Sequence, residues 1–253
     1  MNILCKAVAI TSVQNILMDI RDVKKIYRVG ETRLRALDGI NLQVSEGEFA
    51  CIVGRSGSGK STLLNLIAGL EAVTSGEIVI AGKHIEKMNE SELILFRQRN
   101  IGFVFQSFNL LPHMTALENV ALPLIFKGIP KRMRNKRAME MLEIVGLTSH
   151  AKHKPTQMSG GQQQRVGIAR ALVADPKIVF ADEPTGNLDS RTSDEIMSLI
   201  TGIFIERKTT FVMVTHDPNM ASYANKVVTV LDGKVTDIQY SMYHNTALEE
   251  TAL

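Results

Sequence analysis

The feature that most constrains the fold of this chain is a glycine-rich loop between two apolar segments. The run from Phe49 to Val53 has the length and composition of a strand buried on both faces. It leads directly into Gly54-Arg-Ser-Gly-Ser-Gly-Lys-Ser-Thr62, after which residues 63–68 have helical spacing. This is the Walker A pattern, in the strand–loop–helix setting that a phosphate-binding loop requires. The sequence therefore predicts a nucleotide phosphate site.

The residue types of this loop suit phosphate chemistry. Its glycines let the backbone curl so that successive N–H groups converge on phosphate oxygens, and the helix start adds partial positive charge. Lys60 is expected to reach the β and γ phosphates, Ser61 to offer its hydroxyl to Mg²⁺, and Thr62 to reach the α phosphate. The predicted phosphate-binding residues are Gly54, Arg55, Ser56, Gly57, Ser58, Gly59, Lys60, Ser61 and Thr62.

Two further strand ends carry groups that suit phosphoryl transfer. The apolar run 178–181 ends at Asp182, which is expected to approach the cation directly or through a water. Glu183 follows and is predicted to activate or position the attacking water. His216 comes directly after the apolar strand 211–215. A histidine there can donate to a γ-phosphate oxygen and orient Glu183.

The order of the elements predicts an α/β fold. Strands alternating with helices indicate a parallel sheet with helices on both sides. Helical periodicity dominates over 115–125 and 131–145, which indicates a helical insertion. Two short strands, 227–231 and 234–236, flank Asp232-Gly233, a pair that favours a type I′ hairpin turn.

The 253 residues are predicted to form one main domain. The domain runs from 16 to 236, preceded by an extension (1–15) and followed by a loosely packed tail (237–253) without a clear period.

Composition excludes several classes of protein. A formal net charge of +3 is too weak to argue for nucleic acid, so no nucleic-acid partner is expected. Two cysteines, Cys5 and Cys51, cannot form a disulfide scaffold or a four-ligand metal site, and they fit a reducing compartment. No stretch reaches the roughly 18 apolar residues of a membrane helix. We therefore expect a cytoplasmic protein whose work at a membrane requires a partner.

One segment goes beyond what phosphate chemistry needs. Met158-Ser-Gly-Gly-Gln-Gln-Gln-Arg165 follows the helical insertion, and with it the chain resembles the nucleotide-binding subunit of an ABC transporter. The resemblance covers about residues 16–236, and Met158 replaces the more usual leucine without a large change of volume. The motifs occur in the family's order: the A-loop aromatic Tyr27, Walker A (54–62), the Q-loop Gln106, the signature (159–163), Walker B (178–182), the D-loop (186–189) and the H-loop His216.

The resemblance implies a fold and a mode of action. The fold is a P-loop NTPase of ABC type, with a mostly parallel core sheet, an antiparallel β subdomain and a helical subdomain at about 107–165. Two copies are expected to form a head-to-tail homodimer when ATP is bound, with ATP between the Walker A of one copy and the signature of the other. A separate integral membrane permease is the expected partner, which would place the protein on the inner face of the cell membrane.

The resemblance also implies roles for single residues. Tyr27 would stack on adenine, and Gln106 would touch Mg²⁺ and the attacking water. The implied catalytic residues are Glu183, His216 and Gln106, and the implied Mg²⁺ ligands are Ser61, Gln106 and Asp182. The residues implied to act on a neighbouring copy are Ser159, Gly160, Gly161 and Gln162 of the signature and Asp189 of the D-loop.

The sequences of three segments indicate which branch of the family the chain resembles. Residues 105–120, 181–190 and 215–218 resemble lipoprotein-release, macrolide-export and cell-division ATPases. Similar phrases occur in peptide-detoxification and amino-acid-import relatives, so an importer remains an alternative. A soluble ABC ATPase with another role and a scaffold that binds ATP without hydrolysis also remain open, whereas the guanine-reading Asn-Lys-x-Asp of GTPases is missing. The sequence does not identify the substrate, the direction of transport or the permease.

Overall fold

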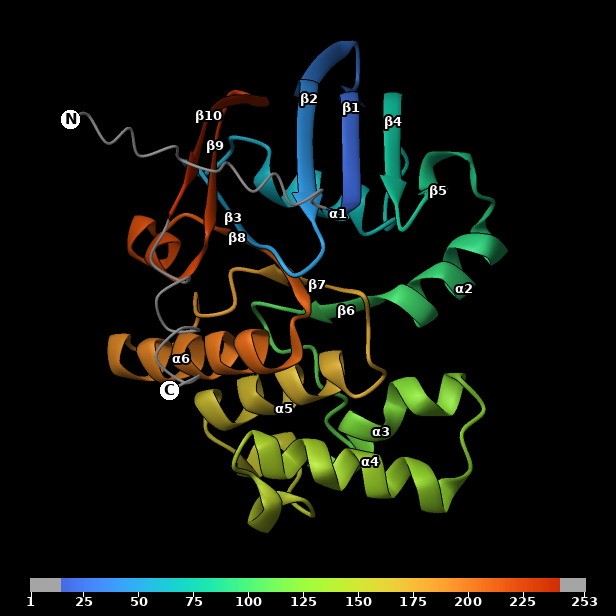
Figure 1. Cartoon of the computed structure of the whole chain (residues 1–253), viewed down its shortest axis with the longest axis vertical. Coiled ribbons are helices and arrows are strands. Elements are labelled where there is room, and N and C mark those ends of the chain that lie inside the picture. The colour runs from blue at the N-terminus through green and yellow to red at the C-terminus, as the bar shows by residue number, and fades with distance from the viewer. Residues whose placement is uncertain (1–14, 242–253) are drawn as a thin grey trace, which may run out of the picture.

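Two β-sheets and a group of helices build the protein (Figure 1). The structure is a computed structural model that describes residues 15–241. Residues 1–14 of the predicted extension and 242–253 of the predicted tail lie outside the described residues.

The central sheet is mostly parallel, as predicted. Its order is β10-β9-β3-β8-β7-β6, with parallel pairing throughout except between β9 and β10. Both faces of β3, β7 and β8 are buried, because layers of structure cover the sheet on each side. The strands are β3 (Phe49–Val53), β6 (Ile101–Val104), β7 (Ile178–Asp182), β8 (Thr210–Thr215), β9 (Lys226–Leu231) and β10 (Lys234–Tyr240).

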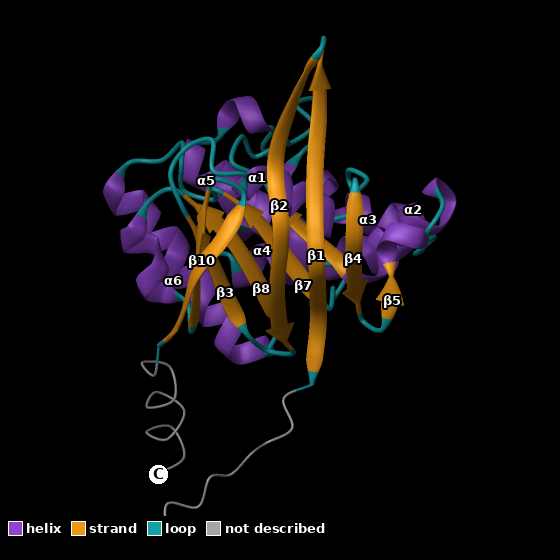
Figure 2. Ribbon diagram, turned by 90° about the horizontal axis from the view of Figure 1, so that it is seen from above, coloured by secondary structure: helices purple, strands orange, loops and turns teal. Residues whose placement is uncertain are grey.

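The second sheet is antiparallel and lies over the core strands (Figure 2). Its order is β2-β1-β4-β5, and its two longest strands form one hairpin. The apolar pattern indicates only a short strand at 41–44, whereas β2 begins at Thr32 because it pairs with β1 along its length. The strands are β1 (Ile16–Val29), β2 (Thr32–Ser45), β4 (Ser75–Ile80) and β5 (Lys83–His84).

Six α-helices complete the fold within residues 15–241: α1 (Lys60–Ile67), α2 (Glu90–Asn100), α3 (Ala116–Phe126), α4 (Lys131–Ile144), α5 (Gly160–Leu172) and α6 (Ser190–Arg207). The predicted helical insertion contains α3, α4 and the first turns of α5. In this part of the chain, none of the helices combines the length and the apolar character needed to cross a membrane.

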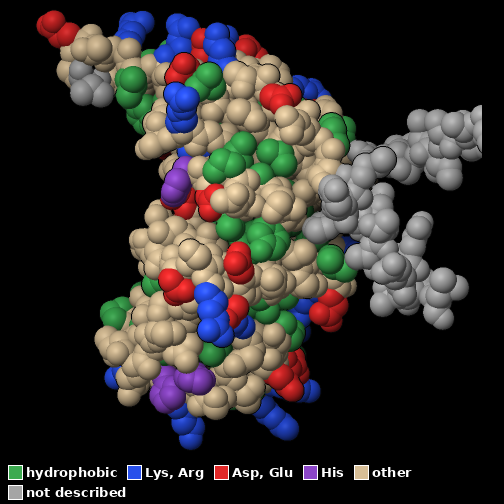
Figure 3. Space-filling model, turned by 90° about the vertical axis from the view of Figure 1, so that its left-hand side faces the viewer, with side chains coloured by type: hydrophobic (Ala, Val, Ile, Leu, Met, Phe, Trp, Pro, Cys, Tyr) green, Lys and Arg blue, Asp and Glu red, His purple; other side chains and the backbone are tan. Residues whose placement is uncertain are grey.

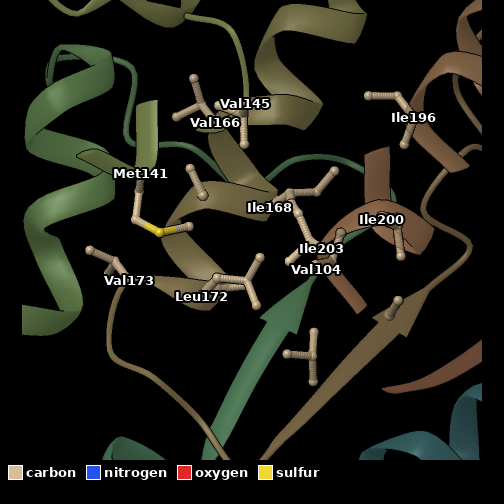
Figure 4. Packing of buried hydrophobic residues seen from close by; sticks show 14 of the residues in the cluster. Val104, Met141, Val145, Val166, Ile168, Leu172, Val173, Ile196, Ile200 and Ile203 are labelled. Carbon is tan, nitrogen blue, oxygen red and sulfur yellow. The ribbon is translucent and has the colours of Figure 1, made fainter. Parts of the chain in front are cut away.

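The core sheet separates two hydrophobic clusters. Val179 and Ala181 of β7 belong to the cluster with α3–α6, and Figure 4 shows Val104, Ile168 and Ile203 in it. Ile178 and Phe180, the alternate residues of β7, belong to the cluster with α1 and the antiparallel sheet. Helices therefore lie on both faces of the core sheet, as predicted, and the antiparallel sheet shares one of these faces with α1.

The C-terminal hairpin confirms one prediction and corrects another. Asp232 and Gly233 have φ angles of 48° and 74°, as a type I′ turn requires. The second strand was expected to stop at Thr236, but β10 continues to Tyr240, which pairs with Lys226. Most of β10 is exposed, so its sequence lacks the alternation that marks a half-buried strand.

The substitution Gly102→Ala tests the close contact between β6 and helix α5. A Cβ atom there would lie 2.4 Å from the carbonyl oxygen of Ala171 in α5, so Gly102→Ala must push the helix away. We expect a loss of about 2 kcal/mol in the free energy of unfolding and a fall in Tm of roughly 4–8 °C. Denaturant and thermal unfolding measure both.

Gly202→Ala is the matched control. Gly202 is a glycine of helix α6, and a Cβ atom added there would have no neighbouring atom within 4 Å, so alanine should stabilise the protein by about 0.5–1 kcal/mol. Equal unfolding curves for Gly102→Ala and Gly202→Ala would contradict the proposed packing of α5 on β6.

Candidate functional site

The phosphate loop lies in close contact with both sheets. Gly59, the N-cap of α1, has a φ of 99°, and a Cβ there would lie 2.6 Å from the carbonyl oxygen of Ala36 in β2. A Cβ on Gly54 would lie 2.2 Å from the carbonyl oxygen of Val230 in β9. Glycine is required at both positions, because any side chain would displace backbone that holds the loop in place.

Lys60 folds back over this loop. Its Nζ donates hydrogen bonds to the carbonyl oxygens of Gly54 (2.8 Å) and Arg55 (2.9 Å), and the residue is only 5% exposed. These contacts keep a cation inside the curl of the backbone, beside the N–H groups at the start of α1. The loop therefore offers a charge and oriented donors to one anion.

Ser61 and Asp182 bring the two halves of the site together. The hydroxyl of Ser61 lies 3.4 Å from Oδ1 of Asp182, which ends β7. Burial and the neighbouring charge of Glu183 raise the pKa of Asp182, while Ser61 and Lys60 oppose that rise. A carboxylate in such a place is stabilised by a nearby cation.

The oxygen atoms at this point fit Mg²⁺. Within residues 15–241 there is no cluster of three or more His, Cys, Asp or Glu side chains that could hold a metal ion alone. Mg²⁺ usually takes one or two carboxylates and completes its shell with water and substrate phosphates. The hydroxyl of Ser61 and the carboxylate of Asp182 suit that pattern.

Glu183 and His216 form a pair at the ends of adjacent strands. Nδ1 of His216 lies 2.9 Å from Oε1 of Glu183. The backbone of Glu183 has a positive φ of 42°, and its N–H donates to the carbonyl oxygen of Val214 in β8. A pocket of 470 Å³ opens beside the pair and is lined also by Gly186 and Asn219.

The signature segment forms the start of α5. Ser159 is the N-cap: its Oγ accepts from the N–H of Gln162 (3.3 Å), and Oε1 of Gln162 accepts from the N–H of Ser159 (2.9 Å). A Cβ on Gly161 would lie 2.6 Å from Cγ2 of Thr192, so this helix start lies directly against α6. Asp189 of the D-loop caps α6 through the N–H and hydroxyl of Thr192.

The signature and the phosphate loop do not meet within one chain. In the described part of the protein, none of the hydrogen bonds made by residues 159–163 reaches residues 54–62. Figure 1 shows α1 on the upper side of the core sheet and α5 on its lower side. One chain therefore presents two separate helix starts that can each bind an anion.

The structure places Tyr27 near the phosphate loop. Its hydroxyl donates to Glu71 (2.7 Å), and the nearby side chain of Thr62 in α1 acts to lower the pKa of Tyr27. Burial and the contact with Glu71 raise the pKa of Tyr27. Stacking of the Tyr27 ring on adenine stays a prediction.

Gln106 lies against the D-loop. A Cβ on Gly186 would be 2.8 Å from Nε2 of Gln106, and Asn187 donates to the carbonyl oxygen of Gln106 (3.0 Å). The Q-loop and D-loop are thus joined in one chain. Contacts of Gln106 with Mg²⁺ and the attacking water stay predictions.

Gln164 is a residue that our sequence reasoning missed. It is fully buried, and its Nε2 donates to the carbonyl oxygen of Pro184 (2.6 Å), directly after Glu183. It therefore joins the signature helix to the end of β7. The available signal was its spacing: Gln164 lies four residues before the apolar Ile168, on the buried face of the helix.

A larger pocket, of 650 Å³, lies away from these residues. It is lined by Lys177, Arg207, Lys208 and Thr210, among others, and contains none of the predicted site residues. The carboxyl ends of the core strands, rather than this pocket, carry the groups suited to phosphate chemistry.

Comparison with known proteins agrees with this geometry. The family model described as ABC transporter matches residues 37–186. An uncharacterized ABC transporter ATP-binding protein of Thermotoga maritima is 49% identical over 222 residues, covering 88% of this chain and 94% of that protein. The lipoprotein-releasing system ATP-binding protein LolD of Geobacter metallireducens is 47% identical over 219 residues, covering 87% of this chain and 97% of LolD.

A fused protein is also similar. The macrolide export ATP-binding/permease protein MacB of Chlorobaculum tepidum is 47% identical over 221 residues, covering 87% of this chain but only 34% of MacB.

A solved structure shows the same fold in a dimer. The cassette MJ0796 of Methanocaldococcus jannaschii, in a dimeric post-hydrolysis state bound to ADP and Pi, has a TM-score of 0.82 and 46% identity, covering 88% of this chain and 98% of that one. The chain belongs to the ABC transporter family and is one of its ATP-hydrolysing ATP-binding cassettes.

Proposed function

We propose that this cassette powers a separate membrane permease by ATP-dependent head-to-tail dimerisation. One observation carries the proposal: the phosphate loop and the signature helix start are separate in one chain, and no hydrogen bond joins them within residues 15–241. A second copy related by a twofold axis supplies to each site the half that the first copy lacks. The similarity to a dimeric cassette supports this arrangement.

The first half of the site binds the triphosphate. The N–H groups of the loop and of α1 surround the phosphates, and Lys60 exchanges its two carbonyl contacts for phosphate oxygens. Ser61 and Asp182 would hold Mg²⁺, which when bound neutralises charge on the β and γ phosphates. Tyr27 and Thr62 lie at the side of the loop where we expect the base and the α phosphate.

Glu183 is proposed to activate the attacking water. An ionised carboxylate can only accept hydrogen bonds, so Nδ1 of His216 must donate to Oε1 of Glu183. That bond fixes the carboxylate and leaves Oε2 to accept a proton from water. Nε2 of a doubly protonated His216 would also donate to a γ-phosphate oxygen. Gln106, held against the D-loop, is proposed to help place the same water.

The second half of the site comes from the neighbouring copy. Ser159, Gly160 and Gly161 present a hydroxyl and two N–H groups at the positive end of α5, and Gln162 and Asp189 cap the two helices beside them. Bound ATP then holds the two copies together. Loss of the γ phosphate removes the anion between them, so hydrolysis releases the dimer.

The type of transport is proposed from the relatives. Macrolide export by MacB and lipoprotein release by LolD favour an export, lipoprotein-release or mechanotransmission system, with the cassette on the cytoplasmic face of the membrane through its permease. An importer or a soluble ABC ATPase is the alternative. Basic and acidic side chains are interspersed on the face shown in Figure 3.

Isolation of the native complex distinguishes these functions. Purification of the cassette from detergent-solubilised membranes, followed by mass spectrometry, should identify an integral membrane subunit in stoichiometric amount. Stoichiometric recovery with ribosomes or DNA instead would overturn the transport proposal.

Lys60→Ala tests the phosphate loop. Loss of the ammonium removes a charge-assisted contact with phosphate, so the Kd for ATP should rise about 10- to 100-fold. Titration with a fluorescent ATP analogue measures the change. Lys87→Ala, at an exposed lysine beside Glu86, is the control and should bind as the parent protein does. Unchanged affinity of Lys60→Ala would argue against the phosphate cradle.

Glu183→Gln tests the catalytic carboxylate. The amide cannot take a proton from water, so turnover should fall by about 10²-fold or more while ATP binding persists. Dimers should accumulate when ATP is added, as measured by size-exclusion chromatography with light scattering. Glu140→Gln, at an exposed glutamate of α4, is the control and should hydrolyse ATP at the parental rate. Parental turnover by Glu183→Gln would refute the assignment of the base.

A further inference from the structure

We propose that His150 is a positioning residue for the signature segment. Through the side chain of Gln162 it holds Ser159 in the orientation in which the serine hydroxyl can donate to a phosphate of ATP bound on a second copy. The inference rests on the proposed dimer and adds to it a residue outside the family's motifs.

His150 ends a short 3₁₀ turn, Thr148–His150, that lies next to the start of α5. Its Nε2 lies 3.1 Å from Nε2 of Gln162, and its Nδ1 lies 3.0 Å from Oγ of Ser149. The ring of His153 meets the ring of His150 edge-on, with 5.0 Å between centroids. His150 and Gln162 are twelve positions apart in sequence, so this contact links the 3₁₀ turn to the first turn of α5.

The backbone decides which atoms donate in this chain of contacts. The N–H of Ser159 can only donate, so the atom of Gln162 that it meets, 2.9 Å away, must be the carbonyl oxygen Oε1. The NH₂ group of Gln162 therefore faces His150, and Nε2 of His150 must accept. The imidazole is then neutral and carries its proton on Nδ1, which donates to Ser149.

This arrangement leaves the donors of the signature free for an anion. Oγ of Ser159 accepts from the N–H of Gln162, so its own proton is not used in the cap. The N–H groups of Gly160 and Gly161 are at the first turn of α5 and have no partner four residues earlier in the helix. Without the acceptor on His150, the amide of Gln162 is free to rotate, and the N–H of Ser159 loses its fixed partner.

The test measures dimerisation separately from nucleotide binding. In the Glu183→Gln background, sedimentation velocity with saturating ATP gives the Kd of the dimer for the parent and for His150→Phe, which keeps a ring but no acceptor. We expect the Kd to rise about tenfold, because both sites of the dimer lose a fixed cap. The affinity of the dilute monomer for ATP should stay unchanged, since the phosphate loop is untouched.

A conservative variant and a distant histidine supply the controls. His150→Gln places an amide oxygen near the position of Nε2 and should restore the Kd to within about threefold of the parent. His84→Phe, at a histidine of β5 paired with Glu86, should have no effect on dimerisation. His150→Ala removes the acceptor without a bulky ring and serves if His150→Phe does not fold.

The outcomes separate this inference from the proposed function. If Glu183→Gln itself forms no dimer with ATP, the proposed dimerisation and the role of His150 are both overturned. If it dimerises and His150→Phe and His150→Ala dimerise equally well, only the role of His150 is overturned. The same holds if His150→Gln is as weak as His150→Phe, or if monomer affinity for ATP falls in parallel, since either result means that His150 acts only in packing.

Discussion

The proposed function of this protein depends on one interaction, the binding of an anion by backbone N–H groups at the start of a helix. The described part of the chain has two such helix starts. The start of α1 follows the glycine loop, and the start of α5 follows the capped Ser159. Each is held against a rigid neighbour at a glycine where no Cβ fits: Gly59 against β2, and Gly161 against α6. The donors are thereby oriented before any anion arrives, which reduces the cost of ordering them on binding. Because the two starts are separate in one chain, the geometry favours a site shared between copies.

Side-chain hydrogen bonds within one chain also link the signature helix to the segment next to Glu183. In the proposed dimer, the signature of one copy serves its neighbour while Glu183 of the same copy serves its own nucleotide. Gln164 hydrogen-bonds the carbonyl oxygen next to Glu183, and Asn187 hydrogen-bonds that of Gln106. These contacts connect the signature helix to the end of β7, and the Q-loop to the D-loop, within one chain.

The parts of the fold that bury apolar surface or bind phosphate could be predicted from the sequence. The apolar runs of β3, β7 and β8 identified buried strands because both of their faces are covered. The helix starts at Thr115 and Ser159 follow reciprocal caps with Glu118 and Gln162, a local signal that does not depend on tertiary structure. The loop residues could be assigned because the chemistry of phosphate restricts the choice of residues.

The remaining parts depend on contacts that a single sequence does not contain. Only Phe96 of α2 is buried, so that helix has no apolar period to detect. The length of β2 depends on pairing with β1, and β10 is an exposed edge. Similarly, the role of His150 can be inferred only from its contact with Gln162 in the fold. The role of Gln164 can be inferred only from its hydrogen bond to Pro184. Tertiary proximity, rather than residue type, defines these positions.

The most direct test of a shared site is the ATP hydrolysis rate per subunit as a function of protein concentration. If each nucleotide needs groups from two copies, the specific rate must fall steadily on dilution, tend to zero where sedimentation shows only monomer, and reach a plateau at high concentration. A specific rate that stays constant down to concentrations at which every copy is monomeric would contradict the account.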